Sequence, residues 1–471
     1  MTPPPPNINP PRSRLRPHHP LPSTTGLRQT LPSYGDAHFS LFLRKVFIKA
    51  LGYSEDTLSR PIIEIINTNS GFNPCHGNAP QLLEAAKRGI HLNGGIAIDF
   101  PTISIHEGFS HPTSMFLRNL MSMDTEEMIR AQPVDACVMI GGCDKTVPAQ
   151  IMGGISANKP VLPLLTGPMM PGSPRGKRVS TIDVEEIMAV NEELAPTIGT
   201  CGVMGTASTM ACITAAPRSD SLAGCICTGC VCVPLALQSK RTLLSVESFY
   251  NAAIVLQAIG GSTNAMVHLM AIVNRHPDIK GTFTLETLDR IGRTTPLLVD
   301  LKPSETMGEV LDRTPFRDFE HSRSIIRPLE DPLYPCSSLA MVYGNIASDG
   351  AVIKASASKD KRLLKHEGRA VVFENSQDLA MRIDDPELEV TADSVLVLKG
   401  IGPIGNPGMP EAGMIPIPRK LAAQGVMDML RVSDGRMSGT AGGDDCVACV
   451  AGGGGAGVGV WGGGDGGCHS V

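Results

Sequence analysis

The sequence has no block of like charge and no long apolar run. Charged residues make up only 18% of the 471 residues, and the formal net charge is -5, so no basic surface for nucleic acid is predicted. Polar residues interrupt every apolar stretch before it reaches membrane-spanning length, which excludes a transmembrane helix. We therefore expect a soluble protein that binds neither nucleic acid nor membrane.

Cysteine is too sparse for a disulfide scaffold. The chain has 13 cysteines, and its first residues lack the apolar core of a secretory signal. Reduced thiols, and therefore possible metal ligands, are the better interpretation, and we expect a cytoplasmic location. The chain is also long enough for two or three domains with hydrophobic cores.

Residues 1–33 combine ten prolines with four arginines and no acidic residue. A mitochondrial leader is also basic, but it works as an amphipathic helix, and proline at this density favours extended chain instead. We predict a disordered proline-rich arm here. A transit peptide, and with it a mitochondrial location, is the alternative.

Apolar runs alternate with helical patterns through residues 34–304. Short apolar runs end at glycine or polar loops, and segments with helical spacing separate them. This alternation predicts an α/β domain in which helices flank a parallel sheet. The strands are expected at Pro61–Asn67, Ala136–Ile140 and Pro160–Leu165, and helices at 40–51, 79–88, 125–131 and on both sides of Gly260-Gly261.

From about residue 305 the residue pattern becomes typical of strands. Residues 368–374 and 393–398 have strand patterns with turns between them, which predicts a smaller β-rich C-terminal domain over residues 305–443. The remaining residues, 444–471, form a glycine-rich tail of low complexity for which we expect no ordered core.

Cys143, Asp144 and Lys145 directly follow an expected strand, in the segment GGCDKTVP. A thiolate suits iron or another soft metal, a carboxylate suits Mg2+, and a lysine in a crowded loop is a candidate base or modification site. The alternative for this tripeptide is a buried cysteine beside a surface ion pair.

Two further cysteines lie in similar settings. Cys75 is in a polar loop after the first expected strand, and Cys201 is in the glycine-containing segment TCGVMGTAST. A single cysteine is by default a small buried hydrophobic residue. Three thiols in separate loops, each near Asn, Asp or Gly, favour a shared cluster, because chemistry in parallel sheets collects beyond the strand ends.

Glu107 and Glu411 are acidic residues in loops that are otherwise poor in charge. The glycine- and proline-rich loop around Glu411 would hold its carboxylate rigidly, which suits a hard metal ion. Ser438 lies in the segment SDGRMSGT. A single serine is not by itself evidence of a nucleophile or a base.

Taken together, these segments resemble the dihydroxy-acid and sugar-acid dehydratase family, which includes dihydroxy-acid, phosphogluconate, arabinonate and xylonate dehydratases. The resemblance extends from about residue 34 to residue 443. The matching motifs are NPC at 73–75, GGCDKT at 141–146, TCGVMGTASTM at 200–210, AIGGSTNA at 258–265, GPIGNPGMPE at 402–411 and SDGRMSGT at 433–440.

The resemblance implies two cofactors and their ligands. An iron–sulfur cluster, [2Fe–2S] in preference to [4Fe–4S], would be held by Cys75, Cys143 and Cys201, with one iron left open as a Lewis acid. The implied ligands of Mg2+ are Glu107, Asp144, Glu411 and a carbamylated Lys145.

The resemblance also implies a hydro-lyase reaction. Ser438 would remove the C2 proton of a 2,3-dihydroxy acid, iron would draw off the C3 hydroxyl, and the resulting enol would tautomerise to a 2-keto acid. Loss of a weakly acidic proton beside a carboxylate needs a cation close to the developing charge. The segments CDKT and MGTAST, and the glutamate at 107, resemble the sugar-acid branch.

A sugar-derived aldonic acid is therefore the expected substrate, and the dihydroxy-acid dehydratase of branched-chain amino-acid biosynthesis is the alternative. Family members are usually dimers or tetramers, so a homo-oligomer is expected.

The sequence departs from the family pattern at two joins, after Ser180 and after Ser304, where family members usually carry extra segments, and in two cysteine-containing segments. Residues 215–241 carry the pair Cys227 and Cys230, and the tail carries the pair Cys446 and Cys449. Such C-x2-C pairs occur at zinc sites, but the spacing between them is far from finger-like. A frameshifted or mis-spliced segment is the preferred interpretation, which leaves a truncated, inactive family member as the alternative to an active enzyme.

Overall fold

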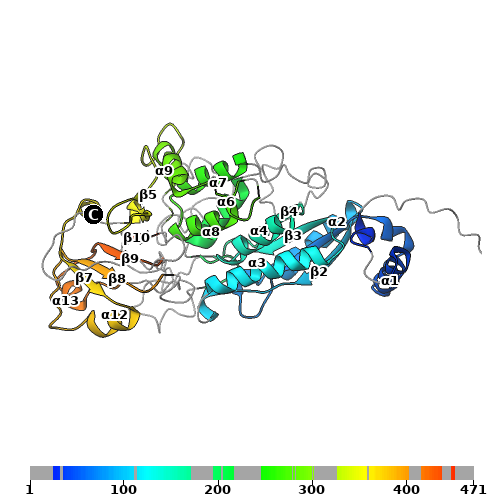
Figure 1. Cartoon of the computed structure of the whole chain (residues 1–471), viewed down its shortest axis with the longest axis horizontal. Coiled ribbons are helices and arrows are strands. Elements are labelled where there is room, and N and C mark those ends of the chain that lie inside the picture. Colours follow the sequence, from blue (N-terminus) through cyan, green and yellow to red (C-terminus); the bar gives the residue numbers. More distant parts are fainter. Residues whose placement is uncertain are drawn as a thin grey trace, which may run out of the picture.

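The structure of the chain is a computed structural model. Two layered regions are visible, one built on each of two β-sheets (Figure 1). The structure describes residues 25–31, 35–110, 114–170, 195–202, 205–216, 246–277, 279–281, 283–299, 301, 326–357, 360–402 and 415–436, and the backbone of 447–450.

The first sheet has four strands, all parallel, in the order β2-β1-β3-β4. Strands β1 and β3 are apolar almost throughout and fully buried, as expected for parallel strands covered on both faces. The bounds are β1 Ile62–Asn67, β2 Ile96–Pro101, β3 Ala136–Gly141 and β4 Val161–Leu165.

Helices cover both faces of the first sheet (Figure 1). On one face, α2 packs Leu83 and Ile90 against Ile63 and Ile65 of β1. On the other face lie α3 and α4, and Ile129 of α3 is part of a second buried cluster. The bounds of the helices in this part of the chain are α1 Ala37–Ala50, α2 Ala79–Leu92, α3 Ser114–Ala131 and α4 Thr146–Ala157.

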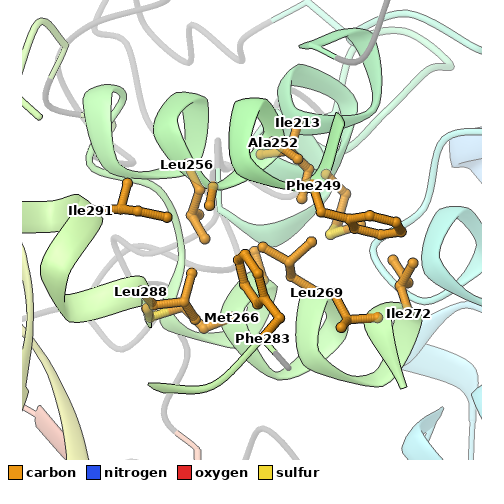
Figure 2. Packing of buried hydrophobic residues seen from close by; sticks show 14 of the residues in the cluster. Ile213, Phe249, Ala252, Leu256, Met266, Leu269, Ile272, Phe283, Leu288 and Ile291 are labelled. Carbon is orange, nitrogen blue, oxygen red and sulfur yellow. The ribbon is translucent and has the colours of Figure 1, made fainter. Parts of the chain in front are cut away.

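A further helical layer packs on α4 and contains the largest hydrophobic cluster. Figure 2 shows Phe249, Leu256, Leu269 and Phe283 converging from several elements of this layer. The glycine pair at 260 and 261 separates two of its helices, and Ser262 caps the second by accepting a hydrogen bond from the Asn264 amide. The helices are α6 Thr206–Ala215, α7 Val246–Ala258, α8 Thr263–Val273 and α9 Leu285–Thr294.

The second sheet has six strands in the order β5-β6-β10-β9-β8-β7. Its strands β7 to β10 pair in parallel, whereas β6 pairs antiparallel with β5 and β10. The described elements are β5 Leu339–Val342, β6 Ala351–Lys354, β7 Ala370–Phe373, α12 Ser376–Arg382, β8 Val395–Leu398, α13 Arg419–Ala422, β9 Arg431–Ser433 and β10 Val447–Val450.

The structure confirms the predicted α/β class, the three predicted strands of the first sheet and the two helices on either side of the glycine pair. One expectation was wrong. Residues 447–450 lie in the glycine-rich tail, yet they form β10 in the middle of the second sheet, because pairing with β6 and β9 fixes a strand that composition alone does not indicate.

Parts of the chain named above lie outside the described residues. They include residues 1–24 of the predicted arm, the cysteine-containing segment 217–245 and residues 451–471 of the tail. The domain boundaries at 33, 304 and 443 stay predictions. Within the described ranges, no helix has both the length and the apolar character needed to cross a bilayer.

Candidate functional site

Predicted site residues follow the carboxyl ends of the strands of the first sheet. Cys75 comes after β1 in a short 3-10 helix, Pro74–His76, and Glu107 comes after β2 in another, Glu107–Phe109. Cys143, Asp144 and Lys145 occupy the turn between β3 and α4. Because the strands are parallel, these turns meet at one edge of the sheet.

Cys75 and Cys143 form a buried pair of thiols. Their side chains are hydrogen bonded, and this bond lowers the pKa of Cys75 and raises the pKa of Cys143. Burial opposes the lowering at Cys75, whereas a hydrogen bond from His106 supports it. Cys75 is therefore the thiolate of the pair, and thiolates are the form that binds metals.

Cys201 reaches the same place from a distant part of the sequence. Its backbone amide is hydrogen bonded to Cys75. The segment before it is held by a bond from the Gly199 amide to the Pro74 carbonyl oxygen (3.1 Å) and by a bridge between Thr200 and Pro168, just after β4. The structure thus brings Cys75, Cys143 and Cys201 together, and Cys201 is half-buried.

The turn that carries Cys143 is tightly held. The Cys143 amide donates to Nε2 of buried His76 (3.2 Å), and Nδ1 of His76 lies 2.9 Å from the Thr68 carbonyl oxygen. Burial lowers the pKa of His76 to about 4, so the ring is neutral and accepts the Cys143 bond. A Cβ atom at Gly142 would lie 1.8 Å from Thr166 Oγ1, which only glycine avoids.

Glu107, Asp144 and Lys145 form an ion-paired group beside the thiols. The fully buried Lys145 Nζ lies 3.1 Å from Glu107 Oε2 and also contacts Asp144 Oδ2. Ser114 Oγ donates to the same oxygen of Glu107. A buried ammonium between two carboxylates marks the point where these groups converge, and carboxylate oxygens are the ligands that Mg2+ prefers.

The second sheet contributes Arg436 to this group. Arg436 follows β9, is 1% exposed, and places Nη2 3.4 Å from Glu107 Oε1. Asp434, two residues earlier, accepts hydrogen bonds from the Gly400 and Ile401 amides at 3.0 Å. The turns after β8 and β9 are thereby tied together, and one of them faces the carboxyl edge of the first sheet.

Two predicted site residues are not placed. Glu411 lies in the segment 403–414 and Ser438 in the segment 437–446, both outside the described residues. The described chain stops at residue 402 beyond β8 and at residue 436 beyond β9, two residues before Ser438. Their roles stay predictions.

Among the described residues, no three side chains of His, Cys, Asp and Glu are grouped closely enough to hold a metal ion as they stand. In the ion-paired group, the Lys145 ammonium lies between Glu107 and Asp144. An ammonium beside the two carboxylates holds the space that a cation bound by both would need. The two carboxylates that could bind a metal ion therefore already lie close together, and the Lys145 ammonium is the group that pairs with both.

Sequence reasoning missed several residues that support this site. His76 adjoins Cys75 in sequence, so its position after NPC was the available signal. His106 precedes Glu107 and Arg436 lies within the segment SDGRMSGT, so both had a similar signal. Arg118 and His268 had none, because they meet through helices that are far apart in sequence.

An α/β protein that gathers thiols, carboxylates and a buried lysine at the carboxyl ends of its parallel strands has the layout of an enzyme. Residues 60–314 match the N-terminal family described as Dihydroxy-acid/6-phosphogluconate dehydratase, and residues 324–452 match its C-terminal family. The chain belongs to the dihydroxy-acid/6-phosphogluconate dehydratase family and is thus a hydro-lyase.

Comparison with characterised relatives agrees with this family. The chain is 36% identical to the 6-deoxy-6-sulfo-D-gluconate dehydratase of Pseudomonas putida, over 84% of this chain and 79% of the relative. It is 37% identical to the L-arabonate dehydratase of Azospirillum brasilense, over 85% and 79%. It is 30% identical to the dihydroxy-acid dehydratase of Methanococcus aeolicus, over 83% and 82%.

The family match corrects the predicted extent of the resemblance. The expected limit was residue 443, but the C-terminal match continues to residue 452 and includes β10. Residues 444–452 are thus part of the family domain.

Proposed function

We propose that this chain dehydrates a sugar-derived aldonic acid to a 2-keto-3-deoxy acid. Relatives named for sugar acids support this substrate class, at 36% and 37% identity, compared with 30% for the dihydroxy-acid dehydratase. A homo-oligomer in the cytoplasm stays our expectation for the assembly and location.

One observation carries the proposal: three thiols and two carboxylates gather at one edge of the first sheet. Cys75, Cys143 and Cys201 meet there without forming a disulfide, which fits an iron–sulfur cluster with one iron short of a protein thiolate. Glu107 and Asp144 share one lysine ammonium.

These donors fit Mg2+ once Lys145 is carbamylated, because the modification replaces the positive charge between the carboxylates with oxygen ligands. Glu411 is the fourth proposed ligand. When bound, the cluster and Mg2+ would supply Lewis-acid stabilisation to the leaving hydroxyl and to the charge that develops beside the carboxylate.

The residues of the chain divide the remaining work. Ser438 is the proposed base for the C2 proton, and it follows Arg436 by two residues, so the buried arginine places positive charge close to it in sequence. Loss of the C2 proton and the C3 hydroxyl releases water and leaves an enol, which tautomerises to the 2-keto acid. Burial of Lys145, Cys75 and Cys143 would keep bulk water away from the reacting atoms.

A substrate panel tests the proposed activity. Anaerobically purified protein, supplied with iron, sulfide, Mg2+ and bicarbonate, would be incubated with arabinonate, xylonate, gluconate and 2,3-dihydroxyisovalerate, and 2-keto acid would be measured. We expect product from at least one aldonate. Product from dihydroxyisovalerate alone would move the chain to the branched-chain enzyme, and iron-loaded protein that converts none of the acids would establish an inactive family member.

Two substitutions separate the proposed roles. Cys143→Ser should abolish the brown colour and the visible absorption of the cluster, because one of three thiolates is lost. Ser438→Ala should keep that absorption and lose at least about a hundredfold in kcat, the typical contribution of a general base. Unchanged turnover in Ser438→Ala would show that another group removes the proton.

A further inference from the structure

Arg118 lies on α3 at the border of the candidate site, and its guanidinium has no acidic partner in the described part of the chain. Its one hydrogen bond there runs from Nη1 to Nδ1 of His268, at 2.8 Å. Its Nε is buried and has no hydrogen-bond partner. Arg118 is half-buried, and partly withdrawing a guanidinium from water without a counter-ion is costly, so this position favours an incoming anion.

The carboxylates near Arg118 are already engaged with other cations. Glu107 is paired with Lys145 and Arg436, and Glu126 is paired with Arg130 and Arg275. Positive charge therefore accumulates around Arg118. Burial, followed by Arg436 and Arg275, lowers the pKa of Arg118 to about 10, which still leaves it charged at neutral pH.

His268 fixes the direction of Arg118. Its side chain is fully buried on α8, and its pKa is lowered far below the usual range, first by burial and then by Arg118, Lys145 and Arg436. The ring is therefore neutral and accepts at Nδ1, which leaves a proton on Nε2, an atom with no hydrogen-bond partner in the described residues. The cations that act on His268 include Lys145 and Arg436, so the pair lies near the ion-paired group that contains Glu107.

We propose that Arg118 binds the C1 carboxylate of the substrate acid and that His268 is the positioning residue that holds the guanidinium for it. This inference rests on the proposed dehydratase function and adds a protein group that recognises the acid. Arginine suits the task because its planar donors match both oxygens of a carboxylate. A carboxylate would also neutralise the uncompensated charge of Arg118.

Binding of a non-reacting acid tests the inference directly. The probe is 3-deoxy-D-gluconate, which lacks the hydroxyl that would leave, and the comparison ligand is its C1 amide, which lacks the charge. By calorimetry on the full-length protein, Arg118→Gln should raise the Kd of the acid on the order of 10–100-fold and leave the Kd of the amide nearly unchanged, as expected for a charge-assisted hydrogen bond. Arg118→Lys should fall in between, because it keeps the charge and loses the planar donors.

Variants of His268 test its positioning role. His268→Leu removes the acceptor and should raise the Kd of the acid roughly 3–10-fold, whereas His268→Asn restores an acceptor near Nδ1 and should bind within about threefold of wild type. The matched control is Arg130→Gln, on the same helix and 53% exposed, with no expected effect. Circular dichroism would check that each variant is folded.

The outcomes distinguish the inference from the proposed function. Turnover of an aldonate together with an unchanged Kd in Arg118→Gln would overturn the inference and leave the function intact. A loss confined to acids that carry a 6-phosphate or 6-sulfonate would also overturn it, because Arg118 would then bind the far end. Wild-type protein that binds acid and amide alike, and converts no acid, would overturn both.

Discussion

The two sheets differ in where their ionisable side chains lie. In the first sheet, Cys75, Cys143 and Lys145 are buried at the carboxyl edge, where strand ends meet. In the second sheet, the buried ion pair Arg431–Asp428 is internal, with 3.0 Å between nitrogen and oxygen, and Arg436 is the described residue that reaches across to Glu107. The first sheet therefore builds the site, and the second completes one side of it.

This comparison gives the largest expected effect at Gly142. In Gly142→Ala the new Cβ would lie 1.8 Å from Thr166 Oγ1 and 2.6 Å from Thr200 Oγ1, so the turn that carries Cys143 must move. Contacts of the same two threonines hold the segments that carry Cys75 and Cys201. We therefore expect loss of iron binding and at least a hundredfold loss of turnover, which corresponds to about 2.7 kcal/mol in the activation free energy. Iron content and the keto-acid assay would measure it.

Two glycine variants serve as controls. Gly71→Ala, in the loop before Cys75, meets no atom within 4 Å and should retain iron. Gly368→Ala, before β7, would place Cβ 1.8 Å from the Asp393 carbonyl oxygen, so it should cost about 1–3 kcal/mol of stability while the folded fraction keeps its iron. Equal iron loss in both crowded variants would show that the sheets are not separable in this way.

The next expected effect is a loss of stability in the second sheet. The side chains of Arg431 and Asp428 are only 3% and 2% exposed. Asp428→Asn leaves the buried Arg431 charged beside a neutral amide, so it should lower the free energy of unfolding by about 3 kcal/mol. Urea unfolding would measure it. Reaction of the thiols in folded, iron-free protein with a thiol reagent should be unchanged, because the described hydrogen bonds of the pair run to Met429 and Ile415 and not to the carboxyl edge of the first sheet.

An exposed pair provides the matched control. Asp384→Asn breaks the contact between Asp384 and Arg419, whose side chains are 41% and 89% exposed, and should cost less than about 1 kcal/mol. If the rate of reaction with the thiol reagent changes in Asp428→Asn but not in Asp384→Asn, the second sheet supports the thiols directly.

The first sheet was the more predictable of the two. Its strands β1 and β3 are buried on both faces and β4 is half-buried along its length, so all three appear in the sequence as mainly apolar runs. Strand β2 escaped prediction because Asp99 interrupts an edge strand that is exposed in part. In the second sheet, the predicted strands at 368–374 and 393–398 correspond to β7 and β8. Strand β9 has only three residues, too few for a periodic pattern to be recognised, and β10 lies in a segment whose glycine-rich composition does not indicate a strand.

The site was predictable only where a motif follows a strand. Cys75 and Cys143 follow predicted strands, and parallel topology brings such ends together. Arg118 and His268, by contrast, lie within helices and are 150 residues apart. Their contact depends on how α3 and α8 pack, which single-sequence patterns do not specify. Residues that position others were therefore missed more often than residues with a candidate ligand role.

The last expected effect depends on pH and concerns Glu64, in the middle of β1 and 2% exposed. Its Oε2 has no hydrogen-bond partner among the described residues, and its register partner on β3 is Cys137. Burial raises the pKa of Glu64 to about 8. The folded protein thus holds a proton that the unfolded chain releases at about pH 4.5, so this carboxyl lowers stability as pH rises between these values, by about 1.4 kcal/mol per pH unit.

Glu64→Gln should remove this penalty, because the amide stays neutral. The variant should gain free energy of unfolding relative to wild type as the pH rises from about 5 to about 7.5, with a slope no greater than about 1.4 kcal/mol per unit. Urea titrations at each pH would measure it, with Glu84→Gln as the control, since Glu84 is 61% exposed beside Lys87. Parallel stability curves for wild type and Glu64→Gln would mean that the carboxyl finds a partner when it ionises. The first sheet would then tolerate an ionised side chain in its centre as well as at its carboxyl edge. Its interior and its site would differ less in their tolerance of charge than the burial of Glu64 suggests.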